Sequence, residues 1–458
     1  MSRTHPVTVV GGGLAGSEAA WQLAEAGVPV VLYEMRPHKT TPAHRTHQLA
    51  ELVCSNSLRS DNPENAVGLL KREMEALGSL IVAAARAWRL PAGDALAVDR
   101  EGFAAAITQV LAGHPQIRVV RKEVTALPDP PAIIATGPLT SPALHLALER
   151  ALGEDSLSFF DAIAPVVAAD SLNMDKLFRA SRYGKGGGLD YLNAPLDREQ
   201  YDRFVAALLA AEKVPLREFE REIPYFEGCL PIEVMAERGR ETLRFGPFKP
   251  VGLRDPRTGA EPYAVLQLRQ DDLAREHYNL VGCQTRMTIP AQKQVFRLIP
   301  GLEQARFVRF GMVHRNTFLC APKFLRPDLE LVGFPGLRLA GQITGVEGYV
   351  ESAATGLLAA LFTLAALLRV PLTPPPTWTA HGGLLRHLRE SPPHRFQPAN
   401  AAWGLMTDPP GPLPRDKRER RRQAVAIALT AIRSWREQLP LPVPSPRVPI
   451  PEVVPWTA

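Results

Sequence analysis

The feature that most constrains the fold is a glycine pattern near the amino terminus. An apolar segment, VTVV, is followed by GGGLAG, a helical alanine and leucine pattern, and a second apolar run, VPVVLYE. A G-x-G-x-x-G turn between a strand and a helix is typical of dinucleotide binding, because its glycines permit a tight turn, close approach of a pyrophosphate and helix-strand packing. We therefore predict an α/β, Rossmann-type domain. The predicted cofactor contacts are Gly11, Gly12, Gly13, Leu14, Ala15, Gly16 and, at the end of the second strand, Glu34.

The identity of the dinucleotide depends on Glu34 and on a second glycine-rich loop. A carboxylate about twenty residues after the turn accepts hydrogen bonds from the adenosine ribose and disfavours a 2′-phosphate. The first turn alone leaves NAD and FAD open. FAD is favoured by ATG at 135–137, which ends a strand, and by LAGQITGVEGYVESAATG, which has the pattern of strand, loop and helix. The positive end of such a helix faces a flavin or its phosphates. Gly341, Gly345 and Gly348 are therefore further predicted contacts, the alternative being a simple turn.

Four segments are expected along the chain. Residues 1–156 and 288–370 carry the strand-helix alternation of the FAD-binding domain, and a single helix is predicted over 66–87. Between them, residues 157–287 contain short strands, turns and the glycine-rich RYGKGGG, which we expect to form a flexible loop in an inserted α+β domain on the substrate side. Residues 371–458 comprise a proline-rich segment expected to lie over the surface, a helix with a basic first half, and an extended tail.

Composition limits the class of protein and its environment. The 458-residue chain is 45% hydrophobic and 22% charged, which is ordinary for a globular protein. No uncharged apolar run reaches the roughly 18 residues of a membrane span, and a strand so close to the first residue leaves no room for a signal peptide. The formal charge of +6 permits an anionic partner such as nucleic acid. The four cysteines form neither a CxxC pair nor a zinc pattern, so we expect free thiols in a reducing cytoplasm and no metal site.

The segment ELVCSNSLRSDN places a thiol, Cys54, among polar side chains. Taken alone, a free cysteine is more often a small buried hydrophobe than a reactive group. However, a loop that follows the second strand of a dinucleotide-binding unit meets the cofactor at the carboxyl edge of the sheet. Polar neighbours such as Asn56 and Arg59 suit a partly exposed thiol whose anion is stabilised. Both interpretations remain open at this point.

Six ordered motifs resemble one known family. HQLAELVCSNSLRSD, FRASRYGKG, GPFKPVGL, MTIPAQKQVFRLIPGLE, RFGMVHRNTF and AGQITGVEGYVESAATG are similar to segments of the folate-dependent tRNA (uracil-C5)-methyltransferases, the TrmFO family, which is related to the MnmG/GidA flavoproteins. The resemblance extends to the basic helix near residue 437. The sequence departs from the family pattern at the triple glycine 186–188 and in the proline-rich tail.

The resemblance implies a fold, a reaction and a set of partners. The fold would be a glutathione-reductase-like FAD-binding domain with an inserted α+β domain and a C-terminal helical segment. The reaction would methylate C5 of the T-loop uridine of tRNA, with 5,10-methylenetetrahydrofolate as carbon donor and NAD(P)H as flavin reductant. Two alternatives are a flavin oxidoreductase that acts on a small molecule and an MnmG-like component of wobble-uridine modification. The oligomeric state and the choice between NADH and NADPH remain open.

The resemblance also implies two functional thiols. Uracil C5 becomes nucleophilic once a thiolate has added to C6, and a base must then remove the C5 proton. By analogy, Cys229 attacks C6 and Cys54 lies close to the flavin as base or covalent partner, and the exchanged assignment stays open. Cys283 and Cys320 match no functional motif.

Basic side chains supply the predicted RNA contacts. Arg179, Arg182 and Lys185 in FRASRYGKG are the first candidates, with Tyr183 as a ring on which a base can stack. The basic first half of the helix at 415–437 is a second candidate. For both, the alternative is a solvated charged surface.

Overall fold

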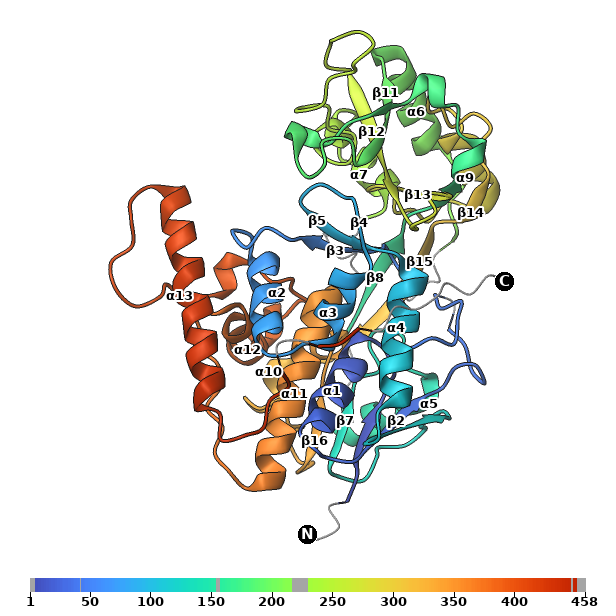
Figure 1. Cartoon of the computed structure of the whole chain (residues 1–458). Helices are drawn as coiled ribbons and strands as arrows, with labels where there is room; N and C mark the ends of the chain where they lie inside the picture. Colours follow the sequence, from blue (N-terminus) through green and yellow to red (C-terminus); the bar gives the residue numbers. More distant parts are fainter. Residues whose placement is uncertain (1–4, 42, 154–156, 216–229, 446–447, 451–458) are drawn as a thin grey trace.

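The protein consists of a larger unit, formed by the amino-terminal and carboxyl-terminal parts of the chain, and a smaller unit above it (Figure 1). The computed structural model describes residues 5–41, 43–153, 157–215, 230–445 and 448–450. Within these ranges, the side chains of 157–163 and 313–317 are not described. The predicted catalytic residue Cys229 lies outside the described residues.

The larger unit is built on a five-stranded parallel sheet in the order β16-β7-β1-β2-β6. The central strand β1 pairs with β2 on one side, from Val7↔Val30 to Val10↔Tyr33, and with β7 on the other. This topology confirms the predicted Rossmann-type α/β class. The strands are β1 (Val7–Val10), β2 (Val30–Glu34), β6 (Ile117–Arg121), β7 (Ala132–Ile134) and β16 (Leu337–Leu339).

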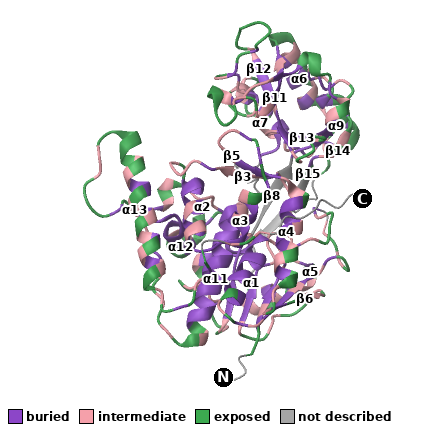
Figure 2. Cartoon of the chain, viewed as in Figure 1, coloured by how far each residue is buried: buried purple, intermediate pink, exposed green. Residues whose placement is uncertain are grey.

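Two helices from opposite ends of the sequence cross closely on this sheet. They are α1 (Leu14–Glu25) and α11 (Tyr349–Leu368). A Cβ on Gly356 would lie 2.1 Å from the carbonyl oxygen of Ala15, so glycine is required at this crossing. By length and composition α11 is apolar enough to cross a membrane, but 89% of its apolar window is buried inside the protein (Figure 2). It serves as the core helix of the larger unit.

The single helix predicted over 66–87 is in fact two helices, α2 (Ala66–Ala76) and α3 (Leu80–Ala87). They are separated at Gly78, whose φ is 74° and whose carbonyl oxygen accepts a hydrogen bond from the Trp21 indole at 3.0 Å. Ser79 then caps α3 by accepting a hydrogen bond from the Val82 nitrogen. The apolar pattern continues across this break, and periodicity alone therefore did not reveal it.

The smaller unit contains a second, six-stranded sheet in the order β10-β11-β12-β13-β9-β14. Its pairings are antiparallel, and its own apolar core is covered by α6 and α9. The bounds are β9 (Val166–Ala168), β10 (Phe178–Arg179), β11 (Tyr191–Leu196), β12 (Ala264–Gln270), β13 (His277–Leu280), β14 (Phe307–Arg309), α6 (Arg198–Ala210), α7 (Ile232–Glu237), α8 (Thr242–Phe245) and α9 (Ile289–Phe296). An antiparallel pair, β8 (Leu157–Ile163) with β15 (Met312–Phe318), connects the two units.

Two elements after residue 287, the expected carboxyl boundary of the inserted domain, pack with the smaller unit. Helix α9 contributes Val295 and Phe296 to the core of the smaller unit, and β14 pairs with β9 at the edge of its sheet. Both elements follow residue 287, so we propose a boundary near the start of β15. No change in composition marks that point in the sequence.

A small antiparallel sheet in the order β3-β5-β4 lies beneath the smaller unit (Figure 1). Its strands are β3 (Ser57–Ser60), β4 (Arg89–Leu90) and β5 (Ala95–Val98), and helix α4 (Arg100–Gly113) follows. The RYGKGGG loop, expected to be flexible, packs against the β4–β5 turn. A Cβ on Gly186 would lie 2.7 Å from the Cα of Gly93, and Lys185 forms an ion pair with Asp94.

The segment after residue 370 is part of the larger core rather than a surface covering. It contains α12 (Ala380–Glu390) and α13 (Lys417–Gln438). Leu384 of α12 and Ile432 of α13 are fully buried in the same apolar cluster as the parallel sheet. The proline-rich composition obscured α12, whose apolar positions are few but face inward. The larger unit also contains α5 (Pro142–Leu152) and α10 (Ala321–Phe324).

Candidate active site

The glycine turn between β1 and α1 has the geometry of a phosphate cradle. Gly11 has a φ of 105°, and a Cβ there would lie 2.6 Å from the Ala135 carbonyl oxygen. A Cβ on Gly16 would lie 1.8 Å from the carbonyl oxygen of Gly11, so this glycine is required for the turn to pack on the helix. A Cβ on Gly13, by contrast, would meet no described atom within 4 Å. The open side of the turn therefore leaves room for a pyrophosphate at the amino end of α1.

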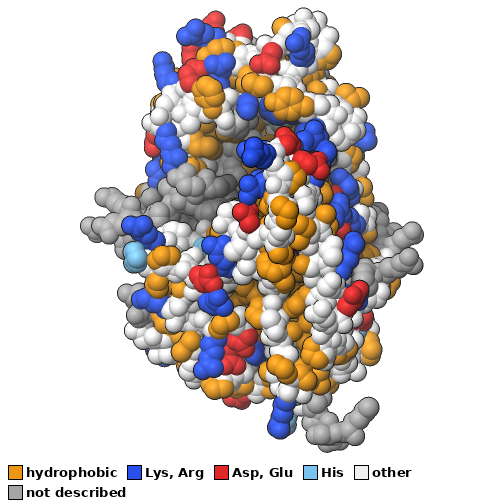
Figure 3. Space-filling model, turned by 90° about the vertical axis from the view of Figure 1, so that its left-hand side faces the viewer, with side chains coloured by type: hydrophobic (Ala, Val, Ile, Leu, Met, Phe, Trp, Pro, Cys, Tyr) orange, Lys and Arg blue, Asp and Glu red, His pale blue; other side chains and the backbone are white. Residues whose placement is uncertain are grey.

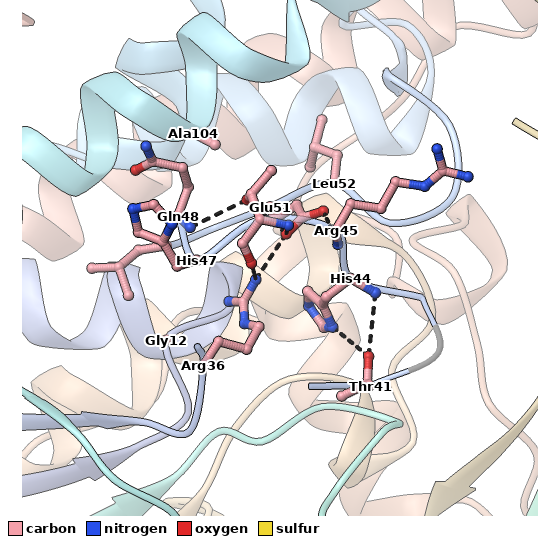
Figure 4. A network of polar contacts seen from close by, with 12 residues as sticks. Gly12, Arg36, Thr41, His44, Arg45, His47, Gln48, Glu51, Leu52 and Ala104 are labelled. Carbon is pink, nitrogen blue, oxygen red and sulfur yellow. Dashed lines mark hydrogen bonds and ion pairs between the residues drawn. The ribbon is translucent and has the colours of Figure 1, made fainter. Parts of the chain in front are cut away.

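Glu34 lies beside this turn, at the end of β2. Its carboxylate accepts a hydrogen bond from the Gly12 nitrogen at 3.0 Å and from the Arg36 guanidinium at 2.9 and 3.1 Å. Burial opposes ionisation, but the hydrogen bonds and the charge of Arg36 lower the pKa of Glu34 below its usual range. Arg36 also binds Glu51 at 2.9 Å, which ties the loop over the turn to the sheet (Figure 4). Glu34 is thus held as a carboxylate in the position predicted for ribose recognition.

A pocket opens at the carboxyl edge of the sheet next to Glu34. It is lined by glycines 11 to 13, Glu34, Thr41, Lys122 and Thr136, among others. Thr136 belongs to the ATG segment, which the sequence associated with FAD. These residues come from the ends of β1, β2, β6 and β7, where ligands bind in open α/β sheets. The pocket, the open side of Gly13 and the ionised Glu34 together fit the adenosine and pyrophosphate of a dinucleotide.

The second glycine-rich loop connects β16 to α11. Gly341, Gly345 and Gly348 all have positive φ, at 83°, 90° and 109°. A Cβ on Gly345 would clash with the Phe396 ring at 2.4 Å, and one on Gly348 with a carboxylate oxygen of Glu351 at 2.5 Å. The fold itself therefore requires these glycines. Their contact with a flavin remains a proposal, supported by their place at the amino end of α11.

Cys54 lies at the junction of the two units and is half-buried. Its main-chain nitrogen donates a hydrogen bond to the Tyr349 hydroxyl at 2.7 Å. Its carbonyl oxygen accepts from Arg100 at 3.1 Å and from Arg309 at 3.5 Å. Burial raises the pKa of Tyr349 far above its usual range, so the phenol stays neutral. The backbone of Cys54 is therefore held from three elements, α4, β14 and α11.

Arg59, expected to support the Cys54 thiolate, instead forms an ion pair with Glu351. Glu351 is fully buried in the first turn of α11. Fully buried Lys71 lies in the same neighbourhood and donates to the Leu58 carbonyl oxygen at 2.9 Å. Burial lowers the pKa of Lys71 to about 7.

Two other cysteines are interior residues. Cys283 is fully buried, and burial raises the pKa of its thiol well above the usual range. Cys320 is also buried and contacts the Pro393 carbonyl oxygen at 3.6 Å. Among the described residues no group of three or more His, Cys, Asp or Glu side chains could hold a metal ion.

The predicted RNA-binding residues lie in and beside the docked loop. Arg179 donates to the Tyr278 hydroxyl at 3.1 Å, and Arg182 donates to the Lys249 carbonyl oxygen at 2.8 Å. The side chain of Lys185 is half exposed despite its ion pair. Tyr183 is 63% exposed, with a left-handed φ of 57°, and its ring lies over Gly252. The loop therefore presents a fixed aromatic ring with cations beside it.

Four residues of the site were not identified from the sequence. Arg36 immediately follows β2, and its proximity to Glu34 is a usable local signal. Arg100, Arg309 and Tyr349 have no such signal, because they reach Cys54 from 46, 255 and 295 positions away.

Comparison with known proteins agrees with this geometry. A family model described as glucose inhibited division protein A matches residues 6–370. The methylenetetrahydrofolate--tRNA-(uracil-5-)-methyltransferase TrmFO of Geobacter sulfurreducens is 59% identical over 418 residues, covering 91% of this chain and 95% of the relative. The chain belongs to the TrmFO family. The TrmFO protein of Rhodospirillum rubrum is 56% identical, and the match covers 99% of this chain and 98% of the Rhodospirillum protein.

A solved structure supports the fold of this TrmFO family member. Aquifex aeolicus GidA superposes with a TM-score of 0.65 at 15% identity, over 94% of this chain and 73% of GidA. At that identity the likeness concerns the fold alone. The two-unit arrangement and the glycine turn of the larger unit therefore belong to a known architecture.

Proposed function

We propose that this chain is a folate- and FAD-dependent tRNA methyltransferase that converts the T-loop uridine to 5-methyluridine. The carbon donor is 5,10-methylenetetrahydrofolate, and NAD(P)H reduces the flavin. The observation that carries the proposal is the high identity with TrmFO proteins along nearly the whole chain. We place the reaction in the cytoplasm, which fits the reduced cysteines among the described residues.

Three groups of residues hold FAD in this proposal. The turn Gly11–Gly16 receives the pyrophosphate, and the Glu34 carboxylate accepts hydrogen bonds from the ribose. The loop with Gly341, Gly345 and Gly348 brings the amino end of α11 to the flavin. Bound FAD, once reduced by NAD(P)H, would supply the hydride that turns the transferred one-carbon unit into a methyl group.

The protein's own thiols carry the covalent chemistry on uracil. We assign addition to C6 to the Cys229 thiolate, which leaves C5 electron-rich and able to form the new carbon bond. Cys54 is held at the junction of the units. We assign to it one of two roles, removal of the C5 proton as a base or formation of a covalent bond to the carbon being transferred. Loss of the C5 proton would release the carbon from its carrier, and addition of a hydride to that carbon would let the C6 thiolate depart and restore the C5–C6 double bond of the ring. The exchanged assignment of the two thiols makes a distinct prediction, given below.

For RNA binding we propose the inserted unit together with the face that carries α13. Lys and Arg side chains gather around a hollow between the two units on this face (Figure 3). Arg179, Arg182 and Lys185, with the exposed ring of Tyr183, would contact the phosphates and an unstacked base.

The experiment combines purified FAD-loaded protein, NADH, labelled methylenetetrahydrofolate and an unmodified tRNA transcript. We expect labelled 5-methyluridine in the T-loop, and none with a transcript in which that uridine is replaced by cytidine. NADH oxidation without any labelled nucleoside would instead indicate a small-molecule oxidoreductase and contradict the proposal.

Single cysteine replacements test the roles. Cys54→Ala and Cys229→Ala are each expected to abolish methylation, whereas the matched control Cys283→Ala retains it. With Cys54→Ala, a trapped tRNA adduct is expected through Cys229. An adduct formed only by the Cys229→Ala protein would reverse the two roles.

A further inference from the structure

The charges around Cys54 do not balance among the described residues. Arg100 lies next to the Cys54 backbone and is paired with Asp271, at 3.0 and 3.1 Å. Arg269, only 7% exposed, donates to Asn56 at 2.8 Å and to Asn279 at 3.5 Å, both of them neutral amides. Arg309 donates to the carbonyl oxygens of Val53 at 3.1 Å and Cys54 at 3.5 Å. Within the described part of the chain, three guanidinium groups thus share one carboxylate.

Arg269 is buried and Arg309 is half-buried. Such an arrangement is unfavourable unless an anion lies nearby, because charges withdrawn from water without counter-charges are destabilising. Burial and repulsion from Arg100 and Arg45 lower the pKa of Arg309 to about 10, consistent with an excess of positive charge. The Cys54 thiol is an electrostatic partner of both Arg100 and Arg269. A thiolate at Cys54 is therefore the anion that the chain itself can supply at this position.

We propose that Arg309 is a positioning residue for the Cys54 thiolate: its guanidinium holds the main chain of Cys54 and supplies the positive charge that keeps the sulfur ionised. The inference rests on the proposed function only in that Cys54 is one of its reacting thiols. Arg309 is the informative residue of the three, since its bonds go to main-chain carbonyls and no carboxylate among the described residues pairs with it.

The other titratable groups near Cys54 either influence the ionisation of its thiol less than Arg309 does or oppose the effect of the arginines. Tyr349 from α11 is a buried neutral phenol. Asp271, which follows β12, opposes the arginines but is bound by Arg100 on both oxygens. Arg45 is exposed and contacts the segment at the Val308 carbonyl oxygen, 3.4 Å away, so solvent screens its charge.

The test is the pH dependence of Cys54 alkylation by iodoacetamide in full-length, FAD-loaded protein. Mass spectrometry of the Cys54 peptide separates it from Cys229. In wild-type protein we expect the pH midpoint of Cys54 alkylation to lie below that of the same peptide in urea-unfolded protein. A free thiol there titrates at about pH 8.5. In Arg309→Gln the midpoint is expected about one pH unit higher, so alkylation at neutral pH slows roughly tenfold. Arg309→Lys, which keeps the charge, is expected to restore most of the shift.

The matched control is Arg306→Gln, three residues earlier in the same segment. Arg306 is exposed and pairs with Asp170 at 2.6 Å, so its loss changes the net charge equally but is expected to leave the midpoint unchanged. Coinciding midpoints for wild type and Arg309→Gln, or equal shifts for both variants, would overturn the inference. If Arg309→Gln does not fold, equal midpoints for native and unfolded wild-type protein overturn it.

The same measurements separate this inference from the proposed function. Wild-type protein that forms no 5-methyluridine but shows the Arg309-dependent midpoint contradicts the methyltransferase and leaves the thiolate assignment standing. Wild-type protein that forms 5-methyluridine, but whose Cys54 is alkylated with the midpoint of the unfolded protein, supports the methyltransferase and contradicts the thiolate assignment.

Discussion

The hydroxyl of Tyr349 accepts a hydrogen bond from the main-chain nitrogen of Cys54 at 2.7 Å, although 295 positions separate them. We expect Tyr349→Phe to leave this nitrogen without its partner and to lower the free energy of unfolding by about 1–3 kcal/mol, the usual penalty for an unsatisfied buried donor. Urea denaturation of FAD-loaded protein measures it. Tyr183→Phe is the control, because that residue is exposed and its hydroxyl makes no bond within the described ranges. Equal losses in the two variants would show that the contact contributes nothing specific.

Gly13→Ala tests the cofactor cradle without disturbing the apoprotein. Gly13 has a φ of −75°, which alanine adopts freely, and open space where its Cβ would lie. We expect the unfolding free energy of apoprotein to stay within about 1 kcal/mol of wild type, while the FAD retained after desalting falls sharply. Absorbance of the bound flavin measures the occupancy.

Gly16→Ala provides the comparison. Its Cβ would meet the Gly11 carbonyl oxygen at 1.8 Å, so this variant is expected to lose stability even without FAD. If Gly13→Ala keeps full FAD occupancy, the pyrophosphate does not approach this turn closely.

Lys71 is expected to make the free energy of unfolding depend on pH. Its folded pKa of about 7 lies below the 10.5 of an unperturbed lysine. Between these values the unfolded chain carries a proton that the folded chain lacks, so the free energy of unfolding rises with pH. Relative to Lys71→Met, wild-type protein is expected to gain stability from pH 7 to pH 10, to lose this gain progressively as the pH falls back toward 7, and to show no further change below about pH 6, where Lys71 is protonated in both states. Urea titrations at each pH measure the difference.

A surface lysine serves as the control for this effect. Lys176 is half exposed and paired with Glu303. The difference between wild type and Lys176→Met is expected to be nearly flat over the same range. A flat difference for Lys71→Met as well would mean that Lys71 stays protonated in the folded protein.

Tyr183 is expected to contribute to tRNA affinity by stacking. Loss of a stacked base weakens binding by about 1–3 kcal/mol, so Tyr183→Ala should raise the tRNA Kd roughly 5- to 150-fold while FAD content is unchanged. Leu189→Ala is a matched control, because Leu189 is 61% exposed in the same loop but has no ring. Filter binding at fixed salt measures both. Equal effects of the two substitutions would indicate disturbance of the loop rather than stacking.

The parts of the structure that were predictable have local determinants. The glycine turn, β1, β2 and Glu34 lie within 28 residues, and the required turn, packing and charge are specified by residue type. The break at Gly78 was missed because apolar periodicity records which face is buried and not where the backbone changes direction. The sequence did not indicate that α9 and β14 pack with the inserted unit, because they join its core by long-range contacts.

The contacts of Cys54 likewise could not be predicted from residues that are close to it in sequence. The sequence placed Cys54 in a polar loop and gave Arg59 among the polar neighbours that suit a stabilised thiol anion. In the structure Arg59 turns to Glu351, whereas Arg100 and Arg309 bind the Cys54 main chain and Arg269 binds Asn56, through contacts that only the tertiary fold creates.

The close approach of Gly186 to Gly93 has a consequence for modular exchange between relatives. The β4–β5 turn belongs, by sequence, to the FAD-binding part of the chain, yet Ala92 of that turn and Tyr191 of the inserted unit pack in one small cluster. An inserted unit transplanted into another member of the family would meet a foreign turn at this position, and the fit is tight because a Cβ on Gly186 would lie only 2.7 Å from the Cα of Gly93. The part of the chain that must be exchanged as one piece is therefore discontinuous in sequence. Residues 91–94 have to be transferred together with the inserted unit that they contact.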